Sequence, residues 1–169
     1  MSSRFSYFED NDITLTGVIH VGAHRGEEVN EYEDLGAKQV IWVEANPDVF
    51  EEMRVALTNA ESAIESHAFQ YAASTEDHAT VKFNRYYGPD AGYLRGNKGC
   101  SSLLKAEGRF EAWYKDTIEV ETITIDTLLE ENDFKVEDFQ LLNMDVQGAE
   151  LMVLKGSEKV LDNVKWVTT

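Results

Sequence analysis

Two glycines and two carboxylates are placed where they could bind a nucleoside and move a proton. Gly22 and Gly26 follow an apolar segment at 16–21, and Glu44 ends a second apolar segment at 39–43, 22 residues after Gly22. In an α/β nucleotide-binding unit the tips of these two strands are neighbours, and an acid on the second tip accepts hydrogen bonds from both ribose hydroxyls. The spacing therefore predicts a pocket for an adenosine-type cofactor. The alternative is an α/β domain with an ordinary tight turn and a solvated Glu44.

The glycine spacing favours a cofactor without phosphate. A dinucleotide fingerprint is G-x-G-x-x-G, whereas here residues 23–24 stand where the middle glycine would let a pyrophosphate approach the backbone. Gly22 would let the turn pass close to the ligand, and Gly26 would permit an unusual backbone angle or close helix packing. Glu27 and Glu28 open the next helix, where carboxylates favour the positive end of the dipole and repel a phosphate. These residues point to S-adenosylmethionine.

Alternating strand and helix patterns must position these residues. Predicted strands cover 16–21, 39–43, 66–71, 79–85, 118–125 and 139–144, with a last one beginning near Val164. Predicted helices cover 27–35 with Gly36 as C-cap, a segment opened by Asn46 and Pro47, 127–131 capped by Asp126, and 148–154 ended by Gly156. The alternation predicts one α/β domain over 1–169 with a mainly parallel sheet.

Two regions lie outside this pattern. Residues 1–12 read as a polar lead-in. Residues 86–116 are rich in glycine and aromatic side chains, which is typical of a lid or binding loop but also of disorder or of a surface loop that packs its own aromatics.

The segment 139–144 is nearly continuous in apolar residues, as expected of a central parallel strand covered on both faces, and it ends at Asp145. Ligands of such sheets bind beyond the carboxyl ends of the strands. Asp145 is therefore a candidate base or acceptor-orienting group. The alternative is a carboxylate that only positions its loop or caps the helix at Gly148.

Composition excludes several classes of protein. A net charge of −17 repels nucleic acid and anionic lipid, and no apolar run is long enough to cross a membrane. The single cysteine, Cys100, and the absence of an apolar secretion signal are compatible with a reducing cytoplasm. The chain has no G-x-S-x-G nucleophile elbow, and the spacing of its histidines gives no support for a metal site, so we expect neither a hydrolase nor a metal.

Five ordered motifs resemble the FkbM-type methyltransferases. They are Val21-Gly22-Ala23 with Gly26, Val43-Glu44-Ala45-Asn46-Pro47, Tyr71-Ala72-Ala73-Ser74, Ser101-Ser102-Leu103, and Leu141 to Gly156 with the core Asp145-Val146-Gln147-Gly148-Ala149-Glu150. The segment 122–129 also resembles the threonine-rich strand that precedes the last motif in that family.

The resemblance implies a Rossmann-like class I methyltransferase, a three-layer sandwich that uses S-adenosylmethionine to methylate a hydroxyl oxygen of a sugar, polyketide or similar metabolite. It places Glu44 at the ribose, Ala72 and Ala73 at the adenine, and Asp145 facing the methyl group. The expected cofactor-binding set is His20, Gly22, Ala23, His24, Gly26, Glu44, Ala45, Asn46, Ala72, Ala73 and Asp145. The expected acceptor-binding set is Ser101, Ser102, Gln147 and Glu150.

The chain departs from the family pattern in three ways. His20 stands where an acid is usual, and Gln147 replaces a glutamate. The sequence also ends at the fifth core strand, so the fold is expected to lack the last two strands and to expose an edge that could pair with a second copy. A non-catalytic cofactor-binding module of the same fold is therefore the alternative function, and a nicotinamide dehydrogenase is a third that the glycine spacing disfavours.

Overall fold

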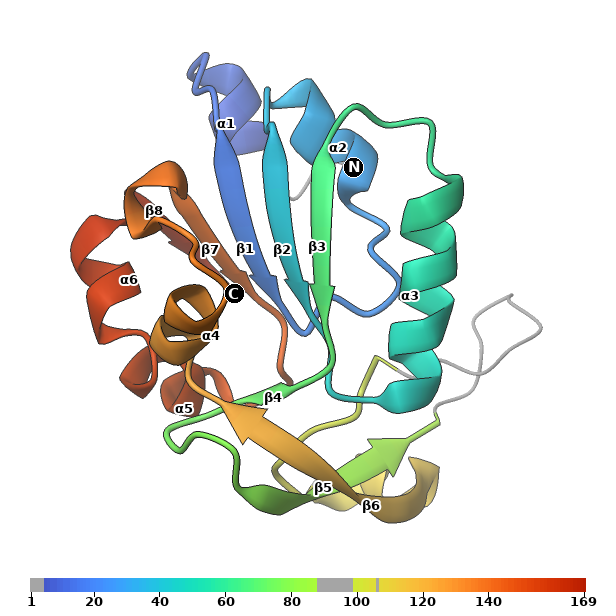
Figure 1. The fold of residues 1–169 in the computed structure, drawn as a ribbon. Coiled ribbons are helices and arrows are strands. Elements are labelled where there is room, and N and C mark those ends of the chain that lie inside the picture. The colour runs from blue at the N-terminus through green and yellow to red at the C-terminus, as the bar shows by residue number, and fades with distance from the viewer. Residues whose placement is uncertain (1–4, 88–98, 106) are drawn as a thin grey trace.

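The computed structural model describes residues 5–87, 99–105 and 107–169. Five parallel strands form the main sheet: β1 (Gly17–Val21), β2 (Gln39–Val43), β3 (Glu65–Phe69), β7 (Leu141–Met144) and β8 (Trp166–Thr168). Their spatial order is β3-β2-β1-β7-β8 (Figure 1). The predicted mainly parallel α/β sheet is thus confirmed.

The register of the central strands sets the site. Val21, the last residue of β1, pairs with Val43 at the end of β2 and with Met144 at the end of β7. The next residues along each strand, Gly22, Glu44 and Asp145, therefore emerge level with one another at one edge of the sheet.

One face of the sheet is covered by α1 (Ser6–Asp10), α2 (Val29–Asp34) and α3 (Pro47–Asn59). Phe5, Tyr32 and Met53 are fully buried there against Trp42 of β2. Residues 5–12 thus differ from the expected polar lead-in, because Phe5 and Phe8 pack into this core while their polar neighbours face outward; residues 1–4 lie outside the described part of the chain.

The other face is covered by α4 (Ile125–Glu131), α5 (Glu150–Lys155) and α6 (Glu158–Asn163), which bury Leu128, Val153 and Val160. A short 3-10 turn, η2 (Val136–Asp138), precedes β7. Helices on both faces make the expected three-layer sandwich. None of the helices in the described part of the chain is long and apolar enough to cross a membrane.

The predicted cap of α4 is wrong. Thr124 is the N-cap residue, and its hydroxyl accepts from the amide of Thr127. The carboxylate of Asp126 instead accepts from the backbone amides of Lys159 and Val160 in α6, at 2.9 and 3.1 Å. Asp126 thus joins two helices rather than beginning its own.

A second, smaller sheet lies beyond the carboxyl edge of the first (Figure 1). It consists of β4 (Ala72–Ala73), β6 (Tyr114–Ile123) and β5 (Thr80–Tyr86) in the order β4-β6-β5. The region expected to be irregular at 86–116 contributes the end of β5, a 3-10 turn η1 (Gly108–Trp113) and the start of β6, while 88–98 and 106 lie outside the described residues.

Candidate functional site

A cavity of about 310 Å³ lies between the carboxyl edge of the main sheet and the small sheet. Its size is at the lower end of the range for small-molecule sites. The turn after β1, the ends of β2 and β7, strand β4 and segment 99–103 all contribute to its wall. From the expected cofactor set it is lined by His20, Gly22, Ala23, His24, Glu44, Ala45, Ala72, Ala73 and Asp145, and from the expected acceptor set by Ser101 and Gln147.

Glu44 is fixed at the cavity wall by the backbone. One carboxylate oxygen accepts from the amide of His24 at 3.0 Å and the other from the amide of Asn46 at 2.8 Å. The residue is only 8% exposed, and this burial raises its pKa from 4.5 to about 7, against the opposing effect of the two amide bonds. Each carboxylate oxygen carries two lone pairs, so both can still accept a hydroxyl from a ligand.

The turn after β1 is held against β2, since the amides of Gly22 and Ala23 both donate to the carbonyl of Val43, at 2.8 and 3.0 Å. Gly22 has a φ of 74°, and a Cβ there would overlap the carbonyl oxygen of Asp145. Its lack of a side chain therefore serves the close approach of the β7 loop. Gly22 also lines the cavity, and the expected close approach of a ligand to this turn stays a prediction.

Gly26 combines both roles that the sequence suggested. Its φ is 70°, and an added Cβ would contact Leu57 at 3.0 Å, so the residue allows an unusual backbone angle and close packing on α3. It is not among the residues that line the cavity.

The two histidines near this turn have different surroundings. His20 is buried, and its Nδ1 lies 3.1 Å from the hydroxyl of Tyr32, which accepts from the side-chain amide of Asn143 at 2.7 Å. His24 has a φ of 49°, and its Nδ1 lies 2.9 Å from a carboxylate oxygen of Glu27. Both residues contribute to the cavity wall.

Part of the cavity wall is apolar. Phe83 of β5 and Ala72 of β4 are buried in one cluster, and Ala45 and Leu103 pack against it. All four also line the cavity, and apolar lining of this kind suits an aromatic base.

Asp145 lies at the end of β7, exposed and on the cavity wall. The side-chain amide of Gln147 donates to its Oδ1 at 2.5 Å. Cys100 also lines this part, and burial, with a smaller effect from the charge of Asp145, raises the pKa of its thiol. The thiol is thus held neutral beside the carboxylate.

Other predicted site residues lie behind the wall. Asn46 is buried and its side-chain oxygen accepts from the amide of Asp48 at 3.3 Å, which confirms it as the N-cap of α3. The hydroxyl of Ser102 donates to the carbonyl of Val146 at 3.1 Å and so ties its segment to the β7 loop. Glu150 accepts from the amide of Gly148 at 3.1 Å.

The charge of the cavity wall is strongly one-sided. Glu27, Glu28, Glu44 and Asp145 all line it, and no lysine or arginine is among the described lining residues. Such a wall disfavours a pyrophosphate and suits a ligand that carries positive charge.

Sequence reasoning did not identify several wall residues, among them Phe83, Leu103, Tyr71 and Cys100. The alternation in 79–85 predicted that Phe83 lies on one face of its strand, but it did not indicate which cavity that face borders. Tyr71 and Leu103 stood inside motifs that were recognised, without a role.

Comparisons with known proteins agree with this geometry. The family model described as the methyltransferase FkbM domain matches residues 20–168. No curated protein sequence matched the chain significantly. Because the family match spans most of the chain, from the end of β1 to β8, the protein belongs to the FkbM methyltransferase family.

Proposed function

We propose that this protein binds S-adenosylmethionine in the cavity and methylates a hydroxyl oxygen of a sugar or another small metabolite. The observation that carries the proposal is Glu44, a buried carboxylate at the tip of β2 that two backbone amides aim at the cavity. A carboxylate in this place is the group that recognises a ribose in α/β nucleotide sites.

The cavity residues fit this cofactor. Glu44 would hold the ribose, and the apolar surface of Ala72 and Phe83 would face the adenine. The backbone turn at Ala23 would meet the methionine part. The acidic wall suits a sulfonium, and the fit does not require a phosphate subsite.

When bound, the cofactor supplies an electrophilic methyl group. The protein's part is then to hold an acceptor hydroxyl in line with it and to take up the hydroxyl proton. Asp145 is the proposed group for this, because it lines the cavity and Gln147 donates a hydrogen bond to its carboxylate. Ser101, on the same part of the wall, would contact the acceptor.

The acidic wall also supports a neutral or cationic acceptor rather than a phosphorylated one. Three other statements stay predictions from the sequence. They are that the protein binds neither nucleic acid nor membrane, that it is cytoplasmic, and that β8 could pair with a second copy.

The test combines binding and turnover. Isothermal titration with S-adenosylmethionine and S-adenosylhomocysteine should give saturable binding that Glu44→Gln weakens. A radiolabelled methyl-transfer screen over glycans and small alcohols should give a product in the wild type and little in Asp145→Asn. Cofactor binding without transfer to any acceptor would instead favour the non-catalytic module, and no binding would refute the proposal.

A further inference from the structure

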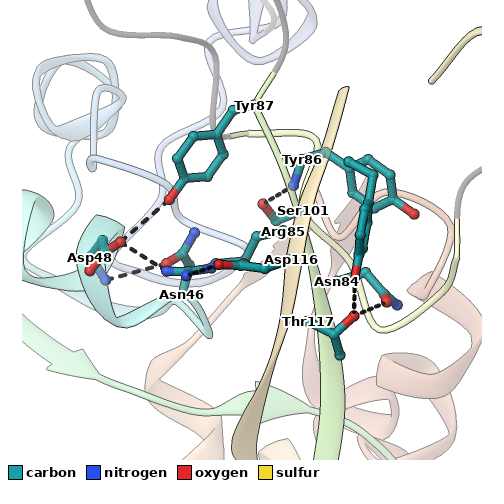
Figure 2. Close-up of polar contacts among 10 residues, drawn as sticks. Asn46, Asp48, Asn84, Arg85, Tyr86, Tyr87, Ser101, Asp116 and Thr117 are labelled. Atoms are coloured by element: carbon teal, nitrogen blue, oxygen red, sulfur yellow. Dashed lines mark hydrogen bonds and ion pairs between the residues drawn. The ribbon is translucent and has the colours of Figure 1, made fainter. Parts of the chain in front are cut away.

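Arg85, outside the cavity wall, joins the small sheet to helix α3. Its Nε and Nη2 donate to the two carboxylate oxygens of Asp116 on β6, each at 2.6 Å. Its Nη1 donates across to Asp48 in the first turn of α3 at 2.9 Å. Figure 2 shows the guanidinium between the two carboxylates. The Arg85 side chain is only 12% exposed, while the side chains of Asp48 and Asp116 are 51% and 41% exposed.

From Asp48 a short series of hydrogen bonds leads to the cavity. The amide of Asp48 donates to the side-chain oxygen of Asn46 at 3.3 Å, and the amide of Asn46 donates to Glu44 at 2.8 Å. The guanidinium of Arg85 is thus three contacts away from the carboxylate that the proposed function assigns to the ribose.

Arg85 also lies on the strand that carries part of the apolar wall of the cavity. Phe83 lies two residues before Arg85 on β5, so both side chains are on one face of the strand. Phe83 lines the cavity. Arg85 therefore connects the strand that carries Phe83 with the helix that follows Glu44.

We infer that Arg85 is a positioning residue for nucleoside binding: through Asp48 it holds the Phe83 wall and the Glu44 carboxylate at a fixed separation. The inference rests on the proposed function, since it concerns how the same cavity grips the nucleoside. It adds a role for two residues, Arg85 and Asp48, that do not contact the cavity.

The test uses Asp48→Asn, which removes the charge but keeps the size of a half-exposed side chain. We expect the Kd for S-adenosylhomocysteine to rise about fivefold, the size of effect typical of a partly buried charged contact. Asp48→Glu should restore most of the affinity. The matched control is Glu51→Gln on the same helix, which breaks the exposed pair with Arg54 and should leave Kd unchanged.

The energetic coupling between Asp48 and Glu44 distinguishes a positioning role from a merely structural one. In a Glu44→Gln background, Asp48→Asn should change Kd less than twofold, because the separation from the Phe83 wall matters only while the Glu44 carboxylate holds the ribose. Equal losses in both backgrounds, or no loss in the wild type, would overturn the inference. Failure of the wild type to bind S-adenosylhomocysteine would instead refute the proposed function itself.

Discussion

The raised pKa of Glu44 makes nucleoside binding depend on pH in a direction that can be calculated. Burial brings this pKa to about 7, and the charged carboxylate accepts two ribose hydroxyls better than its protonated form does. At pH 6 about one site in ten is charged, and at pH 8 about nine in ten are, so Kd should fall about tenfold over this range.

The assay is isothermal titration with 5′-methylthioadenosine, a nucleoside with no group that titrates between pH 6 and 8. At pH 7 binding should release about half a proton, measured by repeating the titration in buffers of different ionisation enthalpy. Glu44→Gln, which cannot ionise, should show a weak and flat Kd. A Kd that is equal at pH 6 and 8 in the wild type, or a slope that persists in Glu44→Gln, would refute the reasoning.

The Glu44 carboxyl also makes the stability of the protein depend on pH. Stability should fall as the pH rises, whereas nucleoside binding should become tighter. A carboxyl with a folded pKa of about 7 and an ordinary value of 4.5 binds its proton more tightly in the folded state. Its stabilising contribution is therefore complete below about pH 4.5 and is lost as the pH rises through 7. Between pH 5 and 8, the free energy of unfolding of the wild type should fall by about 2 to 3 kcal/mol relative to Glu44→Gln.

Three further substitutions test other parts of the account. Gly22→Ala should lower the free energy of unfolding by about 3 kcal/mol or more in chemical denaturation, because its Cβ would overlap the carbonyl of Asp145; Gly108→Ala, with a similar φ but open space around it, should cost only about 1 kcal/mol. Asp145→Asn should lower the methyl-transfer rate about 10²-fold or more, with the Kd for S-adenosylhomocysteine unchanged; an unchanged rate would leave this carboxylate a role only in its loop. Asp126→Ala should destabilise the protein by about 1 kcal/mol by releasing the amide of Lys159, and an unaltered denaturation midpoint would contradict the capping role.

Local sequence signals predicted the elements that carry the cofactor residues. Strand β2 has the predicted bounds because an apolar run stops abruptly at Glu44, and α3 begins as predicted because Asn46-Pro47 is a cap followed by a first-turn proline. Parallel packing then brought Gly22, Glu44 and Asp145 to one edge, as the alternation of strands and helices implied.

The features that the sequence did not predict depend on residues far away in the chain. Helix α1 is too short to show a periodic pattern in the sequence. Only its packing in the structure shows that Phe5 and Phe8 belong to the core. Asp126 is a residue type that often caps helices, and it lies near the start of α4. However, Thr124 caps this helix, and the carboxylate of Asp126 accepts a hydrogen bond from α6. The function of Gly22 is set by a carbonyl 123 residues away, at Asp145, which no local pattern contains.

The most direct test of the central claim is a crystal structure of the protein with S-adenosylhomocysteine. The account predicts the ribose hydroxyls within hydrogen-bonding distance of the Glu44 carboxylate, with the adenine against Phe83. A nucleoside bound outside this cavity, or bound in it with its ribose turned away from Glu44, would contradict the account.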